Sequence, residues 1–180
     1  MRKPHRHKTH KVHKREVPHR KVPFRGVDNT KDIDMILASE KLMQDVLGFS
    51  GDKLGNLFET AVSYLRQHRY EEAVQGFQLL TQLNPYIADF WLGLGLAEQA
   101  QGALPKALSN FLVAETMDPL RIDPYSYAID ICLEMNNIPQ AEAIIDQGTR
   151  YAKKYGKQEE GRILMNALKT LKERVESEKR

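Results

Sequence analysis

Cysteine, glycine, proline and long apolar runs are all scarce in this chain of 180 residues. Its one cysteine, Cys132, cannot form an internal disulfide, which favours a reducing compartment. Eleven glycines and eight prolines are too few for a collagen-like or fully disordered chain. The longest run without polar residues is Phe90 to Ala97, far short of the roughly 20 residues that span a bilayer. The basic N-terminus has no apolar segment after it, so we expect neither membrane insertion nor a secretory signal.

The usual motifs of catalysis and cofactor binding are also missing. The sequence has no phosphate-binding glycine loop, no H-E-x-x-H motif and no cysteine cluster. Gly93 and Gly95 fall inside a predicted helix, where small residues let helices pack, and His68 falls in a predicted turn. Asp123 and Asp130, seven residues apart, are typical of solvated helix positions. We therefore expect a protein that is not an enzyme and that carries no cofactor.

The formal net charge of +3 is an average over two unlike segments. Residues 1–25 hold ten Lys or Arg, one acidic residue and five of the six histidines, a charge of +9. The remaining 17 basic and 23 acidic residues leave −6 for positions 26–180. With so few apolar residues, residues 1–28 are predicted to be a disordered, basic, His-rich tail. Four interpretations stay open: a solvated extension, an electrostatic arm for nucleic acid, anionic membrane or an acidic partner, a loose metal ligand, and a transit peptide.

The rest of the chain repeats itself at an interval of about 34 residues. Matched positions at this interval carry alanine, a bulky apolar residue, a large early residue and an Asn/Asp-Pro pair. These positions are Ala73, Ala107 and Ala141; Phe77, Phe111 and Ile145; Leu57, Trp91 and Tyr125; and Asn84-Pro85 and Asp118-Pro119. Alanine permits two helices to cross closely, and proline ends the second helix of each pair. The period predicts an all-α tetratricopeptide (TPR) superhelix with three repeats at 54–87, 88–121 and 122–155.

A helix is predicted on each side of the repeats. Within 29–49, apolar residues recur at helical spacing from Asp32 to Leu47, and Gly48 follows as a stop signal. Within 156–180, a similar stripe runs from Gln158 to about Ser177. We expect the second helix to cap the last repeat. The first either caps the other end or forms a homodimer with a second copy.

The first helices of TPR units line a concave face that holds extended peptides. Its expected inward positions are Phe58, Val62 and Leu65 in the first repeat, Leu92, Leu96 and Gln99 in the second, and Ser126, Asp130 and Leu133 in the third. Tyr127 lies beside the third set and Tyr70 near the groove edge. The face is therefore apolar over two repeats and more polar in the third. Some of these leucines could instead belong to the core, but contiguous apolar surface usually marks a binding site. The basic residues and asparagine of a carboxylate clamp are absent from these positions.

The run Phe90-Trp91-Leu92-Gly93-Leu94-Gly95, with Gln99, Gly102 and Ala107 after it, resembles the second repeat of the LcrH/SycD-type class II chaperones of type III secretion. The resemblance covers residues 31 to about 175, and the order of helix, three repeats and helix is similar.

The resemblance implies a bacterial cytoplasmic chaperone that holds an extended segment of a hydrophobic translocator protein, with Phe58, Val62, Leu65, Leu92 and Leu96 as client contacts. On this interpretation, nucleic acid is not a partner. The basic tail and the polar third repeat depart from the family. The alternative is an adaptor tethered to nucleic acid or anionic surfaces by the tail, which predicts steeply salt-dependent binding.

Overall fold

The computed structural model describes residues 42–178 and is all-helical over them, as predicted. The basic tail (1–28) and residues 29–41 of the predicted N-terminal helix lie outside the described residues. That helix is represented by one short piece, α2, which ends before Gly48. The described helices are α2 (Met43–Val46), α3 (Gly51–Arg66), α4 (Tyr70–Leu83), α5 (Ala88–Ala100), α6 (Leu104–Met117), α7 (Asp123–Glu134), α8 (Ile138–Lys154) and α9 (Glu159–Glu178).

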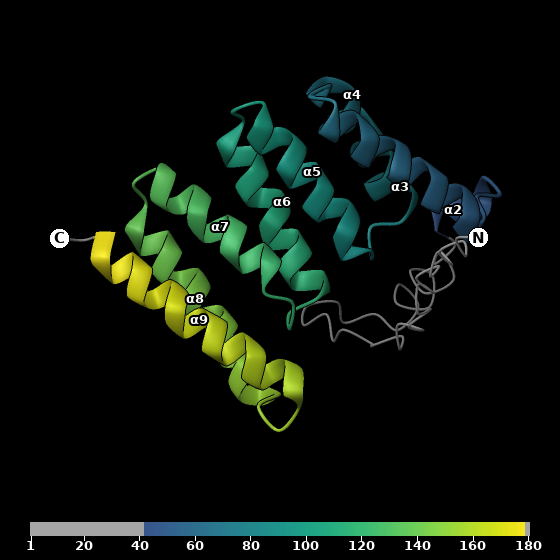
Figure 1. Cartoon of the computed structure of the whole chain (residues 1–180). Coiled ribbons are helices and arrows are strands. Elements are labelled where there is room, and N and C mark those ends of the chain that lie inside the picture. The colour runs from purple at the N-terminus through teal and green to yellow at the C-terminus, as the bar shows by residue number, and fades with distance from the viewer. Residues whose placement is uncertain (1–41, 179–180) are drawn as a thin grey trace, which may run out of the picture. The chain divides into compact units, whose positions relative to one another are not determined.

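Helices α3 to α9 pack side by side in chain order, as Figure 1 shows. Among helices α3 to α9, two further contacts skip a helix: α3 touches α5, and α7 touches α9. These are the first helices of successive antiparallel pairs and the helix that follows the last pair. The structure therefore places α3 beside α5 and α7 beside α9, as the TPR fold requires of the first helices of successive pairs.

The tight turn within each helix pair uses a residue in the left-handed backbone region. His68, Gly102 and Asn136 have φ angles of 60°, 76° and 53°, and they occupy equivalent positions of the three repeats. Glycine and asparagine adopt this conformation at little cost, whereas it is strained for histidine. The same turn geometry thus closes all three pairs, although only the second has the residue best suited to it.

Aromatic rings seated on glycines hold neighbouring helices together. A Cβ atom built at Gly93 on α5 would lie 2.2 Å from the ring of Phe77 on α4, and one at Gly95 would lie 2.5 Å from Phe111 on α6. Both rings are fully buried. At Gly148 on α8 the distance to the ring of Tyr125 would be 2.7 Å. At each of these three positions, the ring fills the space that the side chain of any residue larger than glycine would occupy.

The large residue early in the second and third repeats also bonds to the loop before it. The Trp91 indole N–H donates to the carbonyl oxygen of Pro85 at 2.7 Å. One repeat later, the Tyr125 hydroxyl donates to the carbonyl oxygen of Pro119 at 3.0 Å. A buried polar group needs such a partner, so the repeating aromatic and the repeating proline act as a pair. Cys132 is buried close by, and burial raises the pKa of its thiol to about 11, which makes it unreactive.

A buried carboxyl lies at the junction of the second and third repeats. Glu115 on α6 is 0% exposed, and neither carboxylate oxygen has a partner within hydrogen-bond geometry among the described residues. Burial raises the pKa of Glu115 to about 7, and the nearby Gln147 amide and Tyr125 hydroxyl offset only part of that rise. The carboxylate form is therefore disfavoured where α6, α7 and α8 meet.

We predict that Gly93→Ala lowers the free energy of unfolding by about 2 kcal/mol, because its Cβ collides with the Phe77 ring and overpacking typically costs about 1–3 kcal/mol. Gly55→Ala on α3 is the matched control, since a Cβ there meets nothing within 4 Å. Its better helix propensity should raise stability by about 0.5–1 kcal/mol. Urea titrations followed by circular dichroism measure both changes. An alanine tolerated at Gly93 as well as at Gly55 would contradict the ring-on-glycine packing.

We also predict that the protein loses stability as pH rises from about 5 to 8. The folded-state pKa of Glu115 lies above the usual value of 4.5, so its penalty is absent below that value and complete above about 7. A pKa rise of this size corresponds to about 3 kcal/mol. Glu115→Gln should be more stable at pH 8 and should flatten the dependence, as measured by urea unfolding at several pH values. Glu59→Gln, which alters an exposed side chain on α3, is the control and should follow the unmodified protein. Parallel profiles for Glu115→Gln and the unmodified protein would show that this carboxyl does not carry the effect.

Candidate peptide-binding groove

The seven candidate contact residues come from four helices. Phe58, Val62 and Leu65 lie on α3, Tyr70 begins α4, Leu92 and Leu96 lie on α5, and Tyr127 lies on α7. All except Leu92 are partly buried, so each has one side against the protein and another toward solvent. This condition suits a contact residue, because its position is held before a ligand arrives.

The first-repeat residues rest on an aromatic cluster. The Phe58 ring packs edge-on against Phe77 with centroids 5.9 Å apart, and it lies 5.8 Å from the ring of Phe90. Val62 and Leu65, one and two turns later on α3, pack against the same core. The three side chains therefore form a firm apolar strip along α3.

The second-repeat residues differ in depth. Leu96 is partly exposed and packs against the second core cluster, whereas Leu92 is only 7% exposed and belongs to that cluster. Leu92 thus fits the alternative of core packing, and its contact with a ligand stays a prediction. Leu96 offers the larger surface on α5.

The third repeat contributes an aromatic surface. The Tyr127 ring stacks on Phe111 with centroids 5.3 Å apart and an angle of 25° between the planes. Tyr70 stands elsewhere: its hydroxyl lies 2.7 Å from the His68 Nδ1 atom in the turn between α3 and α4. Tyr70 is therefore held at the end of the first helix pair, apart from the strip on α3.

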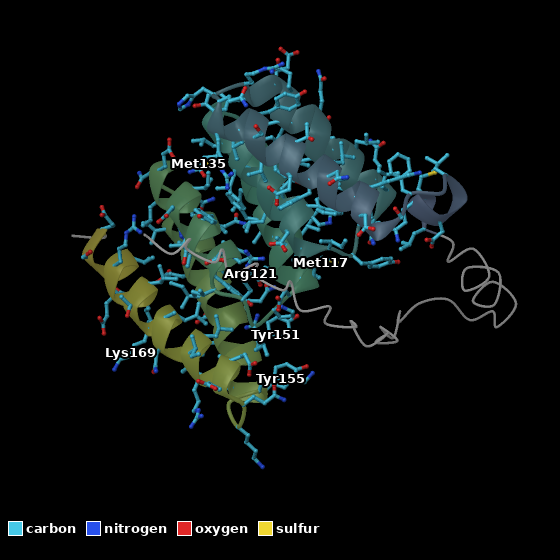
Figure 2. The ribbon with its side chains drawn as sticks, turned by 45° about the vertical axis from the view of Figure 1, so that its right-hand side comes forward. Met117, Arg121, Met135, Tyr151, Tyr155 and Lys169 are labelled. Atoms are coloured by element: carbon cyan, nitrogen blue, oxygen red, sulfur yellow. The ribbon has the colours of Figure 1, made fainter. Side chains whose placement is uncertain are left out.

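Ion pairs that the sequence analysis missed connect the loop before α7 to α5, and connect α7 to α9. Arg121, in the loop before α7, pairs with Asp123 at 3.0 Å and also with Asp89 at the start of α5. Figure 2 shows Arg121 near this loop, with Met135 at the other end of α7. Farther along α7, Asp130 pairs with Arg174 of α9. Asp123 and Asp130, expected to be simply solvated, are thus both ion-paired.

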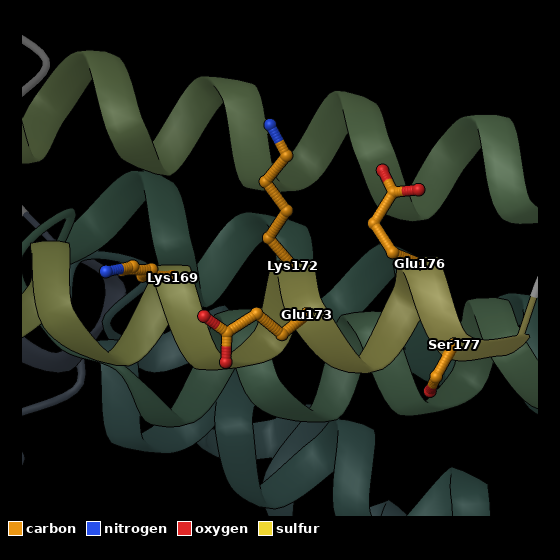
Figure 3. Close-up of a pocket in the computed structure, with 5 residues that line it drawn as sticks. All are labelled: Lys169, Lys172, Glu173, Glu176 and Ser177. Atoms are coloured by element: carbon orange, nitrogen blue, oxygen red, sulfur yellow. The ribbon is translucent and has the colours of Figure 1, made fainter.

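The other surface features of the described residues do not form an apolar groove. The hollow on α9 in Figure 3 is lined by Lys169, Lys172, Glu173, Glu176 and Ser177, a charged helix surface rather than an apolar groove. Within residues 42–178, no three His, Cys, Asp or Glu side chains gather closely enough to hold a metal ion. In the same range, no helix is both long and apolar enough to cross a membrane.

Comparison with known proteins gives sequence and structural relatives, although no protein-family model matches the chain. It is 30% identical over 94 residues to the low calcium response locus protein H of Yersinia pestis and of Yersinia pseudotuberculosis. That match covers 52% of this chain and 56% of those proteins, so the chain spans just over half the length of the curated relatives it matches.

Two solved structures extend the comparison. The translocator chaperone SycD of Yersinia enterocolitica, described as an alternative dimer, is 25% identical with a TM-score of 0.58; the match covers 72% of this chain and 96% of that one. PcrH in complex with the chaperone-binding region of PopD is 24% identical with a TM-score of 0.61; the match covers 74% and 98%.

The helix order defines a tetratricopeptide fold, and the partly exposed apolar strip offers a surface that suits an apolar ligand. The sequence match and the shared fold then confirm the predicted resemblance to the LcrH/SycD-type class II tetratricopeptide chaperones.

Proposed function

We propose that this protein is a bacterial cytoplasmic chaperone, not an enzyme, that binds hydrophobic translocator proteins of a type III secretion system before their export. The observation that carries the proposal is the strip of partly exposed apolar residues formed by Phe58, Val62 and Leu65 on α3 and Leu96 on α5, with Tyr127 on α7. PcrH, which shares the fold, is described in complex with the chaperone-binding region of PopD, and this supports the assignment.

The mechanism follows from burial. A protein that must later enter a membrane has apolar segments that aggregate or insert early when they are exposed. An extended segment that crosses α3, α5 and α7 would contact Phe58, Val62, Leu65 and Leu96. Its own apolar side chains and these residues would shield one another from water. Each filled position contributes roughly 1.5–3 kcal/mol, offset by the ordering of the segment.

The N-terminal helix is the proposed site of self-association. Met43 and Leu47, in and directly after α2, are 51% and 58% exposed, so this end of the described chain offers apolar surface. A homodimer formed there would cover it and leave the strip on α3 and α5 open to the client.

We predict that Val62→Arg and Leu96→Arg each lower client affinity at least tenfold, because one filled position is worth more than the free energy that corresponds to a factor of ten, about 1.4 kcal/mol. The translocator of the same secretion system is coexpressed, captured through a tag on the chaperone and quantified. Circular dichroism checks that the variants remain folded.

Gln75→Arg is the matched control, since it adds the same charge at an exposed position of α4. It should retain the client. Full retention of the translocator by folded Val62→Arg and Leu96→Arg would refute the groove as the binding surface.

A further inference from the structure

One groove position changes character along the repeats. Val62 on α3, Leu96 on α5 and Asp130 on α7 are equivalent positions of successive repeats, and all three are partly exposed. The first two are apolar and the third is a carboxylate. An extended segment that crosses these three helices in order therefore meets two apolar side chains and then an anionic one.

Asp130 already holds a guanidinium in this structure. Arg174 of α9 donates to its carboxylate, and the side chains of Arg174 and Asp130 are 51% and 38% exposed. An ion pair this exposed to water contributes little to stability, so exchanging one cation for another costs little. The pair thus shows both the chemistry that Asp130 accepts and the ease of replacing its partner.

One turn farther along each helix, the charge also becomes more negative from the first repeat to the third. Arg66, Ala100 and Glu134 are the equivalent positions on α3, α5 and α7, and all three are exposed. The first repeat thus carries a positive charge here, the second none and the third a negative one. Glu134 lies four residues after Asp130, on the same face of α7, and reinforces its negative charge.

The spacing of the contacts follows from ordinary dimensions. Packed helices lie about 8–10 Å apart, and an extended chain advances about 3.3 Å per residue. About three client residues therefore separate the contacts on α3 and α5, which touch, and we take the same spacing from α5 to α7 because the repeats are equivalent.

We propose that Asp130 is a specificity-determining residue, which selects client segments that carry a basic side chain about three residues beyond two apolar ones. The client cation replaces Arg174 at the Asp130 carboxylate and forms a charge-assisted hydrogen bond there. This inference rests on the proposed function, since it concerns which translocator segment the same groove takes.

The test uses fluorescein-labelled synthetic peptides with leucine at two positions three residues apart and Arg, Leu or Glu three residues farther on. Each is made in both chain directions, and its affinity for the full chain is measured by fluorescence anisotropy. In one direction, the Arg peptide should bind at least fivefold more tightly than the Glu peptide. Asp130→Leu should abolish that preference and favour the Leu peptide. Arg174→Gln should tighten binding of the Arg peptide, because it frees the carboxylate.

Asp146→Asn, which removes an exposed carboxylate from α8, is the matched control and should keep the preference. No binding of the Arg peptide, or equal affinities that Asp130→Leu leaves unchanged, overturns the proposal. Full retention of the coexpressed translocator by folded Asp130→Arg overturns it as well. These failures differ from failure of the proposed function, which would appear as retention of the translocator by Val62→Arg and Leu96→Arg.

Discussion

The close packing of aromatic rings against glycine backbone is the constraint on which the rest of the structure depends. Phe77 and Phe111 approach α5 from the helices on either side, and each reaches the backbone only because Gly93 or Gly95 lacks a side chain. The two rings fix how far α5 stands from α4 and α6. Since Leu92 and Leu96 lie on the same short helix, their depth follows from this packing. The run of alternating glycines is thus a structural requirement with consequences for the surface.

The same packing explains why the apolar strip can be both exposed and ordered. Phe58 packs against Phe77 and Phe90, and Tyr127 stacks on Phe111, so these proposed contact residues lie directly against core rings. A side chain held in this way loses little rotamer freedom when a ligand covers it. Binding to such a strip gains burial without a large cost in ordering the protein, and the cost falls mainly on the client.

Periodicity predicted the fold well because each repeated residue type has a local physical reason. The repeat interval predicted the helix pairs, and the predicted turn at His68 coincides with a left-handed residue, as do its equivalents Gly102 and Asn136 at the same interval. Depth was harder to predict: the pattern places Leu92 on the inner side of α5 but does not say that it is only 7% exposed. Contacts that follow no period were missed, and the clearest is Arg174, which lies far along the sequence from its partner Asp130. Nothing in the composition of α9 distinguishes that arginine from its charged neighbours.

The C-terminal helix shows how a cap can shape the surface beside it. Leu164, Leu168 and Val175 are buried and cover the third repeat, which is the ordinary task of a terminal helix. Arg174, next to Val175, places its guanidinium on Asp130 while the apolar stripe faces the core. Without α9, the third helix pair would expose apolar surface and an unpaired carboxylate together. With it, the apolar surface is closed and the carboxylate keeps a weakly held cation. The proposed groove therefore ends at a charge that is already balanced but open to exchange, which suits a site that must bind a basic side chain and later let it go.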